Sequence, residues 1–170
     1  MVNRVLLKIL DKLLPTQTAY AHCDVPCGIY DPHHAQMAAH TVIRMMDLIN
    51  DLKLNDSDEA HEKEHHATFA RHVAVKEQHA EIVKHEIRII WGDYFKPEHL
   101  EKHKDLHDLV WKIMKLASKC KQTVDKQVAS DLLDAINKFA EIFWETKAIK
   151  TKKVKAPYPT GKEIVVPVLG

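Results

Sequence analysis

The chain has 170 residues, of which 45% are hydrophobic and 29% are charged, and its formal net charge is +1. This is enough apolar material for one core, while 6% aromatic content and four glycines favour helices and make β architecture an unlikely choice. The near-zero charge argues against a nucleic-acid partner, and three cysteines are too few for a disulfide framework, which predicts a reducing, cytoplasmic location.

Residues 1–21 are predicted to be a removable leader. Between residues 4 and 14 the apolar positions follow one face of a helix, but charged residues interrupt every run. A membrane span needs a much longer apolar run, and the segment is not a clear export signal, so a removable pro-segment is favoured over the alternative of a secretory leader. A small-x-small site ends at Ala21, and a processing protease is therefore predicted to cut after it.

Residues 22–32, with the sequence His-Cys-Asp-Val-Pro-Cys-Gly-Ile-Tyr-Asp-Pro, hold two cysteines spaced as C-x3-C. This spacing is one residue longer than the C-x-x-C of redox sites or of half a zinc finger. Two sulfur donors beside an imidazole, with so few residues between them, bring backbone nitrogens close to any bound ion and favour nickel or copper over zinc. The alternative is a loop with two buried thiols. The third cysteine, Cys120, is predicted to be a packed or surface thiol.

The same segment resembles the metal hook of the nickel-containing superoxide dismutases. Every fixed position of that hook, His-Cys-Asp-x-Pro-Cys-Gly-x-Tyr-Asp-Pro, is present. The resemblance continues in register through residues 76–78, 91–97 and 142–147, while the leader and the C-terminal tail lie outside it.

This resemblance implies an oxidoreductase that disproportionates superoxide to dioxygen and hydrogen peroxide, with one nickel ion per subunit that alternates between Ni(II) and Ni(III). It also implies a homohexamer. The implied metal ligands are His22, Cys23 and Cys27. A further implied catalytic residue is Tyr30, and the implied surrounding residues are Asp24, Pro26 in the cis form, Tyr94 and Lys96.

Two positions depart from the family pattern. Well-known bacterial members place a glutamate and an arginine behind the axial imidazole, where this chain has Ala38 and His79. Both partners are replaced together, so no unpaired charge remains, but the group that orients the His22 ring is left open between His79, His40 and neither.

Four amphipathic helices are predicted after the hook, over about 32–54, 58–90, from Pro97 onward, and 123–149. Asp31 is the expected N-cap of the first helix, with Pro32 as its first residue, and Phe69 begins the expected buried stripe of the second. Short loops between the helices predict an all-α, up-and-down four-helix bundle over 33–149. Residues 150–170, rich in lysine and proline, are expected to be a flexible C-terminal extension.

Two histidine patterns offer competing interpretations. His61 and His65 complete an H-E-x-x-H motif, but its charged flanks at the start of a helix make a zinc peptidase only a minor alternative. His99, His103 and His107 follow an i, i+4, i+8 spacing and are predicted to form a solvated helix face. The main alternative to the enzyme is a nickel or copper binding or delivery protein without turnover.

Overall fold

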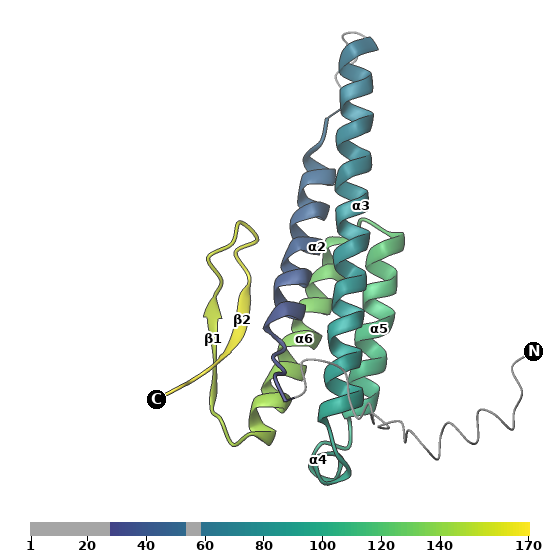
Figure 1. Ribbon diagram of the computed structural model, residues 1–170. Helices are drawn as coiled ribbons and strands as arrows, with labels where there is room; N and C mark the ends of the chain where they lie inside the picture. The colour runs from purple at the N-terminus through teal and green to yellow at the C-terminus, as the bar shows by residue number, and fades with distance from the viewer. Residues whose placement is uncertain (1–27, 54–58) are drawn as a thin grey trace, which may run out of the picture.

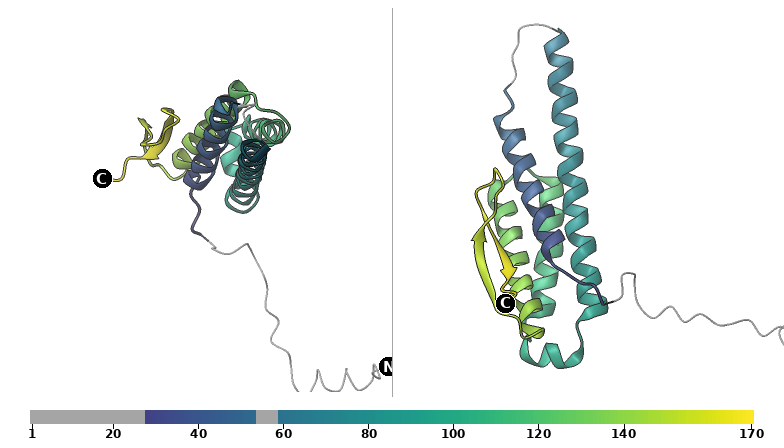
Figure 2. Two further views of the ribbon diagram at one scale, coloured as in Figure 1. Left: turned by 90° about the horizontal axis from the view of Figure 1, so that it is seen from above. Right: turned by 60° about the vertical axis from the view of Figure 1, so that its left-hand side comes forward.

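The computed structural model describes residues 28–53 and 59–170. The leader and the hook residues from His22 to Cys27 lie outside this part of the chain. Within it, long helices form a bundle that carries a small β-hairpin on one side (Figures 1 and 2). The elements are α2 (His33–Asp51), α3 (Glu59–Ile89), η1 (Ile90–Tyr94), α4 (Pro97–Lys102), α5 (Leu106–Gln122), α6 (Lys126–Thr146), β1 (Thr151–Lys155) and β2 (Glu163–Pro167). The all-α fold class and the helical bundle are thus confirmed.

The start of α2 is capped by the aspartate that the sequence indicates. Asp31 Oδ1 accepts the backbone N–H of His33 at 2.8 Å. The helix begins at His33, one residue later than expected, and the carbonyl of Pro32 accepts the N–H of Gln36 at 3.2 Å. The chain that leaves the hook therefore enters α2 through a defined turn.

The helix α3 is longer than the bundle and projects beyond it at its N-terminal end (Figure 1). Phe69 of this helix is 41% exposed, so the expectation that it begins a buried stripe is wrong. Gly92 lies beyond the end of α3. It lies in η1, a single π-helical turn in which Phe95 N–H bonds to the carbonyl of Ile90 at 3.4 Å. Turns of this kind are frequent at functional sites, and this one ends at Tyr94.

The third predicted helix is two helices, α4 and α5, with a break at His103. The expected histidine stripe is therefore wrong, because no single helix carries it. Each ring instead contacts a different neighbour: His99 Nδ1 accepts the N–H of Lys96 at 3.1 Å, His107 Nδ1 accepts the indole N–H of Trp91 at 3.0 Å, and His103 Nε2 lies 3.9 Å from the Glu145 carboxylate.

A buried lysine joins α3 to the end of α5. Lys76 is only 2% exposed, and its Nζ donates to the carbonyls of Cys120, Lys121 and Thr123 at 2.7, 2.8 and 2.8 Å. These are carbonyls that the C-terminus of a helix leaves without intrahelical partners, and they carry its partial negative charge. The Lys76 ammonium group, from the middle of α3, thus donates hydrogen bonds to the carbonyl groups at the end of α5.

The C-terminal residues are not a flexible extension, and that expectation is wrong. Strands β1 and β2 pair antiparallel, from Thr151 opposite Pro167 to Lys155 opposite Glu163. Between them Gly161 has φ +65°, a left-handed conformation that glycine adopts without steric cost. Ile164 and Val165 are 5% and 2% exposed, and the hairpin lies against α6 and α2 (Figure 2).

Candidate active site

The start of α2, the turn η1, the helix α4 and the end of α6 come together at one end of the bundle (Figure 1). An aromatic cluster fills this end. The ring of Tyr94, from η1, lies 5.8 Å from that of Tyr30 and 4.7 Å from that of Phe143, measured between centroids. His99 stacks on Tyr94 at 5.6 Å. The structure thus brings the two predicted tyrosines into contact. Tyr30 lies three residues after Cys27, the last of the predicted metal ligands.

The Tyr94 ring is held in place by a hydrogen bond to α6. Its hydroxyl lies 2.7 Å from Thr146 Oγ1, and Thr146 Oγ1 donates to the Phe143 carbonyl at 2.6 Å. Because the threonine proton is used by the carbonyl, Tyr94 is the donor in the first bond. Thr146 was missed at the sequence level, although it lies within the 142–147 segment that carries the family resemblance.

Two lysines bring positive charge to this end of the bundle. Lys96 is exposed and directly precedes α4. It lies two residues after Tyr94, the last residue of η1. Lys147 Nζ lies 4.9 Å from the Tyr94 ring centroid and 5.2 Å from that of Phe143, which is cation–π distance. Lys147 was not singled out from the sequence, and only its place at the end of the 142–147 match could have indicated it. Lys147 thus places a positive charge beside the Tyr94 ring.

The remaining predicted site residues lie outside the described part of the chain. These are His22, Cys23, Asp24, Pro26 and Cys27. The structure therefore places Tyr30, Tyr94 and Lys96 and is silent on the metal ligands themselves.

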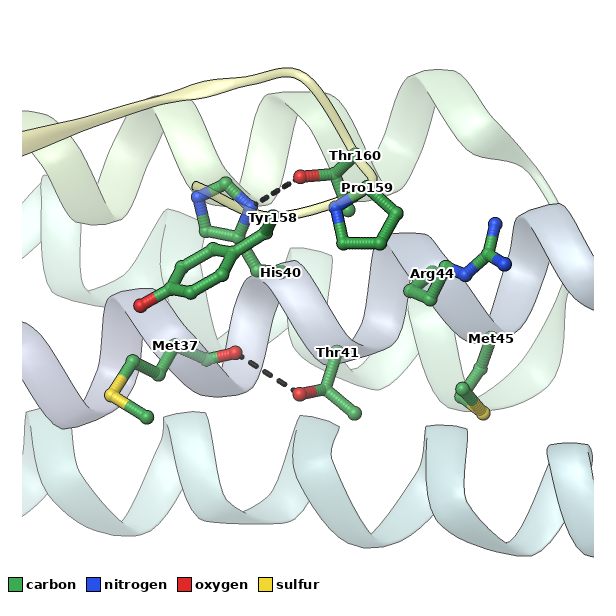
Figure 3. A pocket seen from close by; sticks show the side chains of 8 residues that line it. All are labelled: Met37, His40, Thr41, Arg44, Met45, Tyr158, Pro159 and Thr160. Atoms are coloured by element: carbon green, nitrogen blue, oxygen red, sulfur yellow. Dashed lines mark hydrogen bonds between the residues drawn. The ribbon is translucent and has the colours of Figure 1, made fainter. Parts of the chain in front are cut away.

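The two histidines considered as partners for the His22 ring have other bonds. His79 Nδ1 lies 2.9 Å from the carbonyl of Val75 in its own helix. His40 is 3% exposed, and its Nδ1 lies 2.6 Å from the Thr160 hydroxyl of the hairpin (Figure 3). Burial, and secondarily the charge of His33, lowers the pKa of His40 and favours its neutral form. Ala38 is buried at 2% exposure in the bundle core.

The third thiol does not compete with the hook for a metal. Cys120 is fully buried, and this burial raises the pKa of its thiol to about 11. Over residues 28–53 and 59–170, no group of three or more His, Cys, Asp or Glu side chains is placed to hold a metal ion. Cys23 and Cys27 therefore remain as the thiols of this chain that fit a soft-donor metal site. Their sulfurs, together with nearby backbone nitrogens, form a donor set that suits nickel.

This difference between the thiols predicts a reactivity pattern. At pH 8 a thiol with a pKa of about 11 is ionised in roughly one molecule in a thousand. Reduced, metal-free protein should therefore react quickly with dithiobis-nitrobenzoate at two thiols, and at Cys120 only after unfolding in guanidinium. Nickel added first should protect the two fast thiols. Three fast thiols in native protein would contradict the assignment.

The H-E-x-x-H motif lies far along the chain from this cluster, near the N-terminal end of α3, which projects beyond the bundle (Figure 1). His61 is exposed there, and the described residues around it supply no third ligand for zinc. In the described ranges 28–53 and 59–170, no helix is long and apolar enough to cross a membrane.

Comparisons with known proteins agree on one family. The family model described as nickel-containing superoxide dismutase matches residues 17–147. The nickel superoxide dismutases of Streptomyces coelicolor and Streptomyces seoulensis are 39% and 38% identical over 133 residues, which cover 78% of this chain and 93% of each relative. A native crystal structure of a nickel superoxide dismutase has a TM-score of 0.61 at 39% identity, with 74% of this chain and 99% of that chain covered.

Proposed function

Because this chain belongs to the family of nickel-containing superoxide dismutases, we propose that residues 22–32 form its nickel hook and that Tyr30, Tyr94 and Lys96 surround it. Its activity is the disproportionation of superoxide to dioxygen and hydrogen peroxide, with nickel as cofactor. The relatives support this enzyme rather than a metal-delivery protein or a zinc peptidase. The observation that carries the site is the contact between Tyr94 and Tyr30, which follows the predicted ligand Cys27 by three residues.

In the proposed site, His22 through its terminal amine and imidazole, Cys23 through its amide nitrogen and sulfur, and Cys27 through its sulfur hold the nickel ion. Bound there, nickel supplies a one-electron couple between Ni(II) and Ni(III), and thiolate and amide donors stabilise the higher state. The Cys120 thiol, buried and protonated, takes no part.

The surrounding side chains attract the substrate and limit the access of water. Superoxide is an anion, and the whole chain has a formal charge of only +1, so attraction must come from a local field. Lys96 and Lys147 supply that field beside Tyr94. Tyr30 and Tyr94 present hydroxyl groups and rings that limit water at this end of the bundle, while Asp24 and Pro26 shape the hook.

The proposal extends to processing and assembly. The leader, residues 1–21, is removed by a protease that cuts after Ala21, and the mature chain has a formal charge of −1, since the leader holds three basic residues and one acidic residue. The hooks are sheltered in a homohexamer, and the enzyme is cytoplasmic. Sedimentation of the cleaved protein tests the hexamer directly.

Replacement of either hook cysteine by serine tests the metal ligands. Cys23→Ser and Cys27→Ser should each abolish nickel binding and dismutase activity, because a neutral hydroxyl cannot replace a thiolate toward Ni(III). Nickel content is measured by elemental analysis and activity by superoxide decay. The helical circular dichroism should not change, because the core of α2, α3, α5 and α6 owes nothing to the hook. Activity retained in either variant would refute the site.

A further inference from the structure

The hairpin lies outside residues 17–147, which the family model matches, yet it receives polar side chains of the bundle. Gln36 of α2 and Asn137 of α6 are 1% and 4% exposed, and both bond to β2. Amides are rarely buried unless their hydrogen bonds are satisfied. The bonds that these two side chains make therefore indicate what the hairpin does for the bundle.

Asn137 takes the place of a strand residue beside β2. Its Oδ1 accepts the N–H of Val165 at 3.3 Å, and its Nδ2 donates to the carbonyl of Glu163 at 3.0 Å. These two backbone groups, two residues apart on one strand, are the pair that a single residue of a parallel neighbouring strand would bond. One side chain of α6 thus completes the edge of β2 and fixes the hairpin to that helix.

Gln36 connects this arrangement to α2. Its Nε2 donates one proton to Asn137 Oδ1 at 2.8 Å and the other to the carbonyl of Val165 at 3.1 Å. One turn further along α2, His40 Nδ1 lies 2.6 Å from the Thr160 hydroxyl (Figure 3). The first two turns of α2 are therefore bonded to the hairpin at two positions, Gln36 and His40, which lie one turn apart.

The core itself holds the start of α2 only weakly. The buried apolar residues of its first two turns are Ala35, Ala38 and Ala39, whereas larger side chains begin at Val42. An alanine methyl buries far less apolar surface than a valine, isoleucine or methionine side chain. The directional bonds of Gln36 thus act where hydrophobic anchoring is least, next to the turn at Asp31 and the Tyr30–Tyr94 contact.

We propose that Gln36 and Asn137 are positioning residues for the nickel site, and that the C-terminal hairpin is the element through which they act. By fixing the first turn of α2 against α6, they set where Tyr30 and the hook before it meet Tyr94. Their role is to position other residues, because the hydrogen bonds described for them run to each other and to β2. This inference rests on the proposed hook, because it concerns how that hook is held.

The variant Gln36→Met tests the proposal, because it removes the two Gln36 bonds while Asn137 still holds the hairpin on α6. The matched control is Lys162→Ala, which removes a hairpin bond to Ser130 of α6 at 3.1 Å and leaves α2 untouched. Each protein is cleaved to begin at His22 and loaded with nickel. Nickel affinity is measured by competition with a chelator, and the oxidised centre is examined by electron paramagnetic resonance.

Gln36→Met should bind nickel about tenfold more weakly, the size of effect typical of residues that support metal ligands, and its resonance spectrum should shift. Lys162→Ala should match the parent in both measurements. Asn137→Leu should weaken nickel binding in the same direction, and the effect of the double variant should be smaller than the sum of the two single effects, because the two residues share one network.

An unchanged nickel affinity and spectrum in folded Gln36→Met would overturn the proposal and leave the hairpin a role in stability alone. An equal change in Lys162→Ala would do the same. If Gln36→Met does not fold, Thr160→Val, which removes the other bond to α2 from a surface turn, is measured by the same criteria. A parent protein that binds no nickel would instead contradict the proposed hook itself, before any variant is compared.

Discussion

Full-length protein in which the Ala21–His22 bond is intact is expected to show no dismutase activity, even when it is expressed with nickel. The nitrogen of His22 is an amide in that chain and becomes a basic amine only after cleavage. An amide nitrogen binds a metal ion only after it loses its proton, so the intact chain lacks the neutral amine donor that the proposed site takes from His22. If cleavage after Ala21 creates this amine, as we propose, the leader is expected to prevent redox chemistry until cleavage and nickel binding have both occurred.

Superoxide decay is compared between the full-length chain, a chain cleaved to begin at His22 and one cleaved to begin at Ala21. Only the second should be active, because a free amine on Ala21 lies one residue too far from Cys23 to close the same chelate ring. Intact mass verifies each terminus. Equal rates for full-length and His22-initiated protein would show that the amine is not a ligand.

Lys76→Met should lower the free energy of unfolding by about 2 to 4 kcal/mol. The substitution keeps the length of the side chain but removes three hydrogen bonds from an ammonium group to the end of α5. Burial lowers the pKa of Lys76, so the cost of desolvating its charge offsets part of the gain. Thermal unfolding followed by circular dichroism should show a midpoint about 6 to 12 °C lower.

The control for this variant is Lys84→Met, on the same pair of helices. Lys84 Nζ donates to Ser118 Oγ at 3.0 Å in a partly exposed position, so its loss should cost less than about 0.5 kcal/mol. If the two variants were equally stable, the carbonyls at the end of α5 would be satisfied equally well by water, and Lys76 would not be a stabilising cap.

Helical periodicity was enough to predict the bundle, and it failed where an interruption was ignored. Leu100 and Leu106 are six residues apart, a gap that no single helix face explains, and the chain breaks between them at His103. The hairpin also had a signal, because residues 164–166 are β-branched and follow Gly161. Lysine and proline content outweighed that signal, although exposed lysines are compatible with a strand such as β1, whose other residues are partly buried.

The site was predictable only through the resemblance. No periodicity places Tyr30 beside Tyr94, since the contact depends on how η1 meets the start of α2. Gln36 and Asn137 were missed for a related reason. A polar residue among helical core positions shows that a partner is needed, but in this chain the partner is the backbone of a strand more than 20 residues beyond Asn137.

The hairpin also shows how this chain carries a strand without inviting aggregation. Unpaired strand edges are templates on which a second chain can add in register. In the described sheet, β1 is an edge strand, and Lys152, Lys153 and Lys155 along it are all exposed. The edge of β2 is already occupied by the Asn137 side chain. The edge of β2 is thus filled by a side chain of the same molecule. On β1, Lys153 lies 3.6 Å from Glu141, while the positive charges of Lys152 and Lys155 repel an incoming copy, so the sheet stays at two strands.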